Sequence, residues 1–316
     1  MAASELHHDL RTDRESTDGN AARWQVIWNA HSGSAAENEH VLLSLANRRG
    51  VVVSQSKSAD DAQRLAQAAA LSGANMIVAA GGDGTVNSVA QGILQAKTET
   101  PLAILPLGTG NDFCRNMGIP IDPEQALQLL NHPRRRKVDV IRAETKTRTA
   151  HYINMATGGN TARYSDAVTE ETKQFWGPLA YLRGAVELLT ALDTFHVRIA
   201  FEDEAPLEAD VLNLFLANGK LSGGGLMVAP DAEMDDGLLD VIVVRDCSAS
   251  DIATLAAQYA LTDYRQHASI TYRQTRKVTL SASPPLAITT DGDLLTDEPA
   301  TLHVLPRALN VVVPEQ

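Results

Sequence analysis

The stretch ANMIVAAGGDGTVN occupies residues 74–87 and combines a strand, a glycine loop and the start of a helix. Residues 76–80 form a short apolar run, the pattern of a strand that is buried on both faces. Two glycines end the run, and apolar residues then recur at helical spacing, so a helix is expected to begin near Thr85. A phosphate can approach bare glycine backbone and the unpaired N–H groups of a first helical turn, so the stretch predicts an anion site.

Asp83 is an unusual member of such a loop. A carboxylate repels phosphates unless a cation lies between them or the carboxyl group takes up a proton. Its presence therefore favours Mg²⁺-nucleotide chemistry over passive phosphate binding.

A second glycine loop follows in the chain. Residues 102–105 form another short apolar strand, and PLGTGNDF at 106–113 again places glycines and a hydroxyl group directly after it. Loops at the carboxyl ends of neighbouring parallel strands face one crevice, which is where open α/β sheets bind ligands. The two loops are therefore expected to form one site.

GGDGTVN at 81–87, followed by PLGTGNDFCRNMGIP at 106–120, resembles the bacterial diacylglycerol kinase-like lipid kinases. These share a catalytic domain with eukaryotic diacylglycerol and sphingosine kinases. The resemblance extends from about Trp24 to Pro314. The second loop is its more specific part, because NAD kinases and phosphofructokinases carry loops similar to GGDGT.

The resemblance and the sequence pattern together predict two domains behind a polar tail. Residues 1–22 are polar and charged and are expected to be disordered. Residues 23–137 are expected to form an α/β domain with a parallel sheet, of the NAD kinase and diacylglycerol kinase type. Residues 138–316 are rich in short β runs, which favours a β-sandwich whose last strands could return to the first domain. A helical insertion is expected at 175–192.

Helices are expected between the strands of the first domain. One is expected over about 35–49, and another begins at a cap formed by Asp60 or Asp61. Asp122 is expected to cap a third helix, which Pro123 opens.

The resemblance implies that ATP binds on the glycine loop and on side chains from the neighbouring turns. Two positions depart from the family pattern, since Ala30 replaces a proline and Ser56 replaces a threonine. The implied nucleotide contacts are Asn29, Gly33, Ser56, Gly81, Gly82, Asp83, Gly84, Thr85, Val86, Asn87 and Thr109.

An acidic turn, APDAEMDDGLLD at 229–240, suits a hard cation because Mg²⁺ prefers carboxylate and carbonyl oxygens. The resemblance implies a structural Mg²⁺ held by the Asp236 carboxylate and by the backbone carbonyls of Glu233 and Leu238. A turn with solvated acidic side chains is the alternative.

The sequence DGD at 291–293 stands where the family has Asp-Gly-Glu, whose glutamate is proposed as the general base. The resemblance therefore implies Asp293 as the catalytic base. It implies Asp83 as a second catalytic residue, acting through a catalytic Mg²⁺ or assisting the base. Asp293 is one methylene shorter than glutamate, and a base must come within hydrogen-bond reach of the proton that it takes.

The chain of 316 residues carries a formal net charge of −12, which argues against a nucleic-acid partner. Two distant cysteines without metal-ligand spacing favour a reduced, cytoplasmic protein. No apolar run is long enough to span a bilayer, so a lipid substrate would be reached peripherally, at the inner face of the membrane. A basic cluster at 134–137 is interpreted as a solvated connector or as a contact for anionic headgroups. The oligomeric state stays open, with a homodimer as one option.

The resemblance implies transfer of the ATP γ-phosphoryl group to the hydroxyl of a diacylglycerol-like or phosphatidylglycerol-like lipid. The alternatives are a sphingoid or ceramide kinase, an NAD kinase, and a catalytically impaired homologue that binds nucleotide or lipid. The aspartate at position 293 is the feature that favours the impaired homologue.

Overall fold

The computed structural model of this protein describes residues 23–161, 192–202, 204–261, 263–291, 293–296 and 299–315. The chain divides into two compact units, a first unit of Met1–Val138 with Ala308–Gln316 and a second unit of Asp139–Arg307. The expected tail at 1–22, and all but the last residue of the expected helical insertion at 175–192, lie outside the described residues.

The first unit is built on a parallel sheet. In sheet order its strands are β2 (Val51–Gln55), β1 (Trp24–Trp28), β3 (Met76–Gly81), β4 (Leu102–Pro106) and the end of β17 (Ala300–Val313). Trp28 pairs with Ala80 and Ala80 pairs with Leu105, so the carboxyl ends of β1, β3 and β4 lie at one edge. β3 and β4 are buried along their whole length, as their continuous apolar sequences predict.

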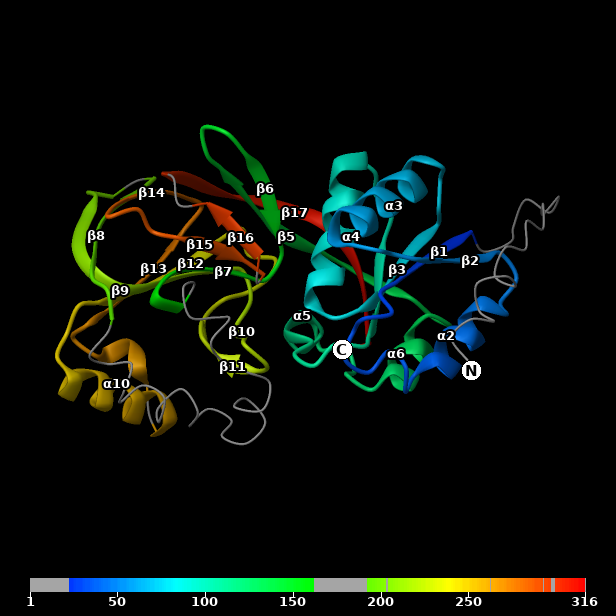
Figure 1. The fold of residues 1–316 in the computed structure, drawn as a ribbon, viewed down its shortest axis with the longest axis horizontal. Helices are drawn as coiled ribbons and strands as arrows, with labels where there is room; N and C mark the ends of the chain where they lie inside the picture. The colour runs from blue at the N-terminus through cyan, green and yellow to red at the C-terminus, as the bar shows by residue number, and fades with distance from the viewer. Residues whose placement is uncertain are drawn as a thin grey trace. The chain divides into compact units, whose positions relative to one another are not determined.

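Helices cover both faces of this sheet, with α3 and α4 on one side and α2 and α6 on the other (Figure 1). The helices of the unit are α2 (Glu39–Ala46), α3 (Ala59–Leu71), α4 (Asp83–Ala96), α5 (Asp112–Met117) and α6 (Pro123–Leu129). A parallel sheet covered on both faces is the predicted α/β architecture.

The first residues of the helices can be compared with the caps that the sequence predicts. Asp122 caps α6 by accepting a backbone N–H of the first turn at 2.9 Å, as predicted. The cap of α3 is Ser58, whose Oγ accepts the N–H of Asp61 at 3.1 Å, so the prediction of Asp60 or Asp61 is wrong. α4 begins at Asp83, two residues before the expected start.

α2 begins later than expected, at Glu39 rather than near residue 35. The N–H of Ser34 donates to the carbonyl of Leu107 at 3.0 Å, and its Oγ donates to the same oxygen at 3.2 Å. Ser34, directly before the expected start, is therefore held by the loop after β4.

Gly92 lies where α4 packs against α3. A Cβ at Gly92 would lie 2.3 Å from the carbonyl oxygen of Gln63 and 2.7 Å from the Cβ of Ala66. Gly92→Ala is therefore expected to lower the free energy of unfolding by about 1–3 kcal/mol, the usual cost of overpacking. This loss should appear in urea denaturation even though alanine is the better helix former.

Gly84→Ala is the matched control, because Gly84 lies in the same helix and nothing among the described residues lies within 4 Å of its added Cβ. This control should keep or raise the stability. A Gly92→Ala protein as stable as the control would contradict the prediction, because α3 and α4 would then move apart without any loss of unfolding free energy.

The second unit is antiparallel β structure, as the short β runs of the sequence predict. In order of pairing, β16, β15, β7, β9, β8, β14 and β17 form one path, while β12 joins β9 to β13 and β5 pairs with β6. The strands are β5 (Arg134–Glu144), β6 (Thr149–Tyr152), β7 (Met155–Gly159), β8 (Phe195–Phe201), β9 (Leu207–Ala217), β10 (Leu221–Ser222), β11 (Leu226–Met227), β12 (Leu239–Arg245), β13 (Ile270–Thr275), β14 (Lys277–Ser283), β15 (Ile288–Thr290) and β16 (Asp293–Thr296). In β8 the alternate residues Phe195, Val197 and Ile199 are buried in the core of the unit, which is the period of a half-buried strand.

The second unit also contains a helix that the sequence analysis does not anticipate, α10 (Ala249–Leu261), followed by a short 3₁₀ turn, η3 (Tyr264–Gln266). The Oγ of Ser248 accepts the N–H of Asp251 at 3.2 Å, and Asp251 accepts the N–H of Ser248 at 3.1 Å. This reciprocal pair is a capping box, and its spacing was the available signal for the helix.

The basic cluster at 134–137 forms the start of β5, so the interpretation as a connector is wrong, although its side chains are largely exposed as expected. The contact with anionic headgroups stays a prediction. Arg134 pairs with Glu315 at 2.5 Å, and Lys137 pairs with Glu99 at 2.9 Å. Exposed ion pairs of this kind contribute about 0–1 kcal/mol each. None of the helices in the described part of the chain is both long enough and apolar enough to cross a bilayer.

Candidate functional site

Two glycine loops meet at the edge of the parallel sheet in the first unit. Gly81 pairs with Pro106, and the N–H of Leu107 donates to the carbonyl of Gly81 at 3.0 Å. A Cβ at Gly108 would lie 2.4 Å from the Cα of Gly82. Only glycine permits this approach, so the two loops that the sequence places on neighbouring strands form one surface of bare backbone.

The turn after β1 joins the same edge. The Nδ2 of Asn29 donates to the Oγ1 of Thr85 at 3.2 Å, and the backbone N–H of Asn29 donates to the carbonyl of Ala80 at 3.0 Å. A Cβ at Gly33 would lie 2.9 Å from the Oγ1 of Thr109. The structure therefore brings together residues from three separate turns that the sequence analysis assigned to nucleotide binding. It does so although Ala30 replaces the proline of the family pattern.

Asp83 opens α4 and anchors the start of α5. One oxygen of its carboxylate accepts the N–H of Phe113 at 3.0 Å. Burial raises the pKa of Asp83, the Phe113 N–H opposes that rise, and the nearby charge of Asp112 adds to it. The carboxylate thus has a structural role that the sequence did not reveal, in addition to the predicted role beside phosphates.

The remaining predicted nucleotide contacts differ in how they could act. The side chain of Val86 is buried, so a contact from this residue would come from its backbone. Asn87 is also buried, and its Oδ1 has no hydrogen-bond partner within the described residues. Ser56 lies at the end of β2, where its N–H and its Oγ both donate to the carbonyl of Trp28, at 2.8 and 3.2 Å.

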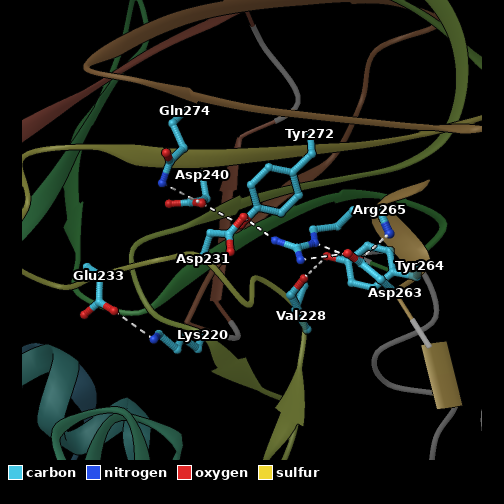
Figure 2. Close-up of polar contacts among 10 residues, drawn as sticks. All are labelled: Lys220, Val228, Asp231, Glu233, Asp240, Asp263, Tyr264, Arg265, Tyr272 and Gln274. Carbon is cyan, nitrogen blue, oxygen red and sulfur yellow. Dashed lines mark hydrogen bonds and ion pairs between the residues drawn. The ribbon is translucent and has the colours of Figure 1, made fainter. Parts of the chain in front are cut away.

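The acidic turn predicted to hold Mg²⁺ lies in the second unit. The Oδ1 of Asp236 accepts the N–H of Leu238 at 2.9 Å. Figure 2 shows the pair that the carboxylate of Glu233 forms with Lys220, at 2.8 Å. Burial raises the pKa of Asp236, and the neighbouring carboxylates, that of Asp139 among them, add repulsion. A divalent cation would offset this crowding of negative charge, so the donors present suit Mg²⁺.

Asp139 organises this turn and was missed by the sequence analysis. It is fully buried, its Oδ2 accepts the N–H of Gly237 at 2.7 Å and its Oδ1 accepts the N–H of Arg307 at 2.7 Å. Its own N–H donates to the carbonyl of Met234 at 2.7 Å. Asp139 lies between two valines of a strand. Because a buried charged side chain is rare without a partner, this position was the available signal that the carboxylate has a structural role.

Further polar contacts tie the acidic turn to β13 and η3 (Figure 2). Asp240 accepts hydrogen bonds from the Tyr272 hydroxyl at 2.5 Å and from the Gln274 amide at 3.2 Å, and burial raises its pKa to about 6. The guanidinium of Arg265 binds both Asp231 and Asp263. No group of three or more His, Cys, Asp or Glu side chains that could hold a metal occurs in the described part of the chain. The predicted set relies on one carboxylate and two carbonyls, and it stays a prediction.

The DGD turn precedes β16. Asp291 has a φ of 46°, and its carboxylate accepts the N–H groups of Ile153 at 3.2 Å and Met155 at 3.0 Å. Asp293 is the first residue of β16 and pairs with Thr290, while its side chain lies outside what the structure describes. Asp291 therefore fixes the turn, and the role of Asp293 as a base stays a prediction.

Glycine loops, a helix N-terminus and converging amide and hydroxyl groups at the carboxyl edge of a parallel sheet define a class of protein that binds phosphate groups. Residues 23–143 match the family model described as the diacylglycerol kinase catalytic domain, and residues 154–313 match that of the YegS C-terminal NAD kinase beta sandwich-like domain. The chain belongs to the family of diacylglycerol kinase-like proteins that combine these two domains.

Relatives of known sequence agree with this membership. A Pseudomonas aeruginosa protein named "Probable lipid kinase YegS-like" is 32% identical over 289 residues, which cover 89% of this chain and 92% of that protein. A protein of the same name from Stenotrophomonas maltophilia is 29% identical over 310 residues, covering 92% and 96% of the two chains. The resemblance stated from the two glycine loops is therefore confirmed.

Solved structures share the fold. A diacylglycerol kinase from Bacillus anthracis superposes with a TM-score of 0.72 at 22% identity, covering 94% of this chain and 98% of that one. Yeast NADH kinase complexed with NADH superposes with a TM-score of 0.51 at 12% identity, covering 94% and 85%. The predicted fold class, an α/β domain followed by a β-sandwich-like domain, is confirmed.

Proposed function

We propose that this protein is an ATP-dependent lipid kinase, which transfers the γ-phosphoryl group of ATP to a lipid hydroxyl. The observation that carries the proposal is the meeting of three turns, with Gly82 against Gly108 and Asn29 on Thr85, at the edge of the parallel sheet. The names of the relatives support the same activity.

The glycine loops would hold the phosphates of ATP. Backbone N–H groups at the start of α4 donate to phosphate oxygens, and the positive end of the helix favours their charge. Asn29, Thr85 and Thr109 would add side-chain contacts. Transfer of a phosphoryl group depends mainly on positioning and on neutralising charge. The glycine loops would supply the positioning.

Two groups of residues would hold Mg²⁺. Asp83 lies at the start of α4 beside the proposed phosphate cradle and would bind the ion that accompanies ATP. Asp236, with the carbonyls of Glu233 and Leu238, would bind a structural ion in the acidic turn. When bound, the catalytic ion neutralises charge on the phosphates.

Asp293 would take the proton from the acceptor hydroxyl. As the hydroxyl oxygen forms its bond to the γ-phosphorus, the bond from that phosphorus to the β–γ bridging oxygen breaks, and ADP leaves. The acceptor would be a diacylglycerol-like or phosphatidylglycerol-like lipid, reached by peripheral contact with a membrane.

A single assay tests the activity and its main rivals. The full-length protein with radiolabelled ATP and Mg²⁺ is offered diacylglycerol, phosphatidylglycerol, sphingosine, ceramide and NAD in separate reactions. Label in one of the glycerolipids is the expected result. Label in NAD alone would replace the proposal by an NAD kinase, and ATP binding without any transfer would identify a catalytically impaired homologue.

The structural Mg²⁺ predicts a metal-dependent stability. Without ATP, EDTA should lower the melting temperature of the wild type, because an ion that binds only the native state stabilises it by about 2.7 kcal/mol at 100 times its dissociation constant. A change of this size is expected to shift the melting temperature by roughly 5–10 °C for a domain of this size. Asp236→Asn, which keeps an oxygen for the Leu238 N–H, should be insensitive to EDTA.

Asp210→Asn is the control, since Asp210 is an exposed residue of β9 whose carboxylate binds His196 at 2.9 Å and no other side chain in the described part of the chain. This variant should respond to EDTA like the wild type. A wild type that EDTA does not affect, and that metal analysis shows to be free of divalent ions, would remove the structural site.

A further inference from the structure

The second unit has a cavity of about 430 Å³ that the proposed kinase site does not use. Its lining includes two lysines, two threonines and a histidine, namely Lys146, Lys277, Thr145, Thr301 and His303. None of these residues belongs to the nucleotide loops, the acidic turn or the DGD turn.

Strand pairing places these side chains on one face. Lys277 on β14 is directly opposite His303 on β17, and Thr279 is opposite Thr301. Residues two apart in a strand point to the same face, so Thr301 joins His303 there. Thr145 and Lys146 directly follow the end of β5 and close the cavity.

His303 presents an unmet hydrogen-bonding group. Its Nε2 is buried and has no hydrogen-bond partner in the described part of the chain. A buried polar atom without a partner costs free energy, and native proteins rarely leave one unsatisfied. A rotation of the imidazole toward the cavity would let a ligand oxygen become that partner.

Among the described residues that line the cavity, two lysines stand against one carboxylate, that of Glu144. Lys146 and Lys277 form no ion pair with any described residue, and the lining carboxylate of Glu144 is already bound to Arg142. The pKa of the nearby His151 is lowered, first by burial and then by the positive charge of Arg142, while Glu144 opposes this change. The formal net charge of the whole protein is −12, so two neighbouring lysines without an ion pair to a described residue do not follow from its composition.

We propose that this cavity binds a phosphate group, carried by a phospholipid headgroup or by a free phosphate ester. The two lysine ammonium groups supply charge-assisted hydrogen bonds, and the threonine hydroxyls donate or accept hydrogen bonds. The imidazole of His303 provides a further hydrogen-bonding nitrogen. The site lies on residues of the second unit alone and does not depend on the proposed kinase activity.

Amine labelling of the full-length protein, read by mass spectrometry, tests the site directly. The rates at Lys146 and Lys277 are compared in sodium chloride, in inorganic phosphate at equal ionic strength, with phosphatidylcholine vesicles, and with vesicles that also contain phosphatidylglycerol. The exposed Lys97 at the C-terminal end of α4 in the first unit serves as the internal reference. Slower labelling of the cavity lysines alone is the expected result.

The pattern of protection identifies the source of the phosphate. Protection by inorganic phosphate supports a site for free phosphate esters, and protection only by the anionic vesicles supports a headgroup site. Equal labelling rates under all conditions would overturn the proposal.

A pair of double variants provides the second test, because both remove two positive charges. Lys146→Gln with Lys277→Gln should weaken binding of the protecting probe by at least about tenfold, since a charge-assisted hydrogen bond contributes about 1.5–3 kcal/mol. The control, Arg64→Gln with Arg198→Gln, removes exposed arginines that pair with Asp61 and Glu208, and it should bind like the wild type. Equal affinities of the two double variants would show that net charge, and not the cavity, attracts the probe.

Discussion

Asp83→Asn is expected to abolish most phosphoryl transfer while leaving the melting temperature close to that of the wild type. Asparagine keeps an oxygen that can accept the Phe113 N–H, but it loses the negative charge that would hold a cation beside the phosphates. Loss of one preorganised electrostatic group typically lowers the rate by about 10²–10³-fold. Steady-state kinetics with saturating ATP and lipid, together with thermal melts, measure both effects.

Asp83→Ala separates the structural role from the catalytic one. Alanine leaves the Phe113 N–H without its acceptor, so this variant should lose about 1–3 kcal/mol of stability in addition to its activity. Asp60→Asn, an exposed change of charge in α3, should match the wild type in both measurements. Normal turnover by Asp83→Asn would show that the Asp83 carboxylate anchors the start of α5 and has no role in catalysis.

Asp293→Asn is expected to lower the catalytic constant by about 10²–10⁴-fold, the usual contribution of a general base, and to leave ATP affinity nearly unchanged. Asparagine preserves the shape of the side chain and removes the basic oxygen. Single-turnover rates and nucleotide binding, measured on the same preparation, separate the two quantities. Turnover like that of the wild type would remove Asp293 as the base, and the loose transition state of phosphoryl transfer would then need none.

Asp293→Glu introduces the glutamate of the family pattern to which the DGD sequence is similar. If the shorter side chain only slows a working enzyme, glutamate should equal or raise the activity. If the surrounding backbone has adapted to aspartate, the longer side chain should lower it. Asp291→Asn is the contrasting variant, because Asp291 accepts two backbone N–H groups and its replacement should affect stability more than the catalytic constant.

The parts of the fold that could be predicted rest on local sequence patterns. The apolar runs at 76–80 and 102–105 correspond to the buried strands β3 and β4. The late start of α2 could not be predicted, because it depends on the bonds from Ser34 to the distant Leu107. Tertiary contacts override helix propensity at such ends, whereas the capping box of α10 and the Ser58 cap of α3 were local signals left unused.

The candidate site also combines features that local sequence predicts with features that depend on distant contacts. The meeting of the two glycine loops follows from their places on neighbouring parallel strands. The place of Asp139 between two valines hints at a buried carboxylate, but its partners Gly237 and Arg307 do not follow from a local pattern, because they are 98 and 168 residues away in the chain. The anchoring of α5 by Asp83 is likewise a contact across 30 residues, which no spacing rule describes.

The path of β17 has a consequence for how the protein is made. This strand pairs with β14 in the second unit and then, at Val311, with Leu102 of β4 in the first. During synthesis the ribosome therefore completes the whole second unit before it releases the last strand of the first. The parallel sheet of the first unit stays one strand short until then, and a fragment ending at residue 137 would expose the edge of β4 to pairing with other chains.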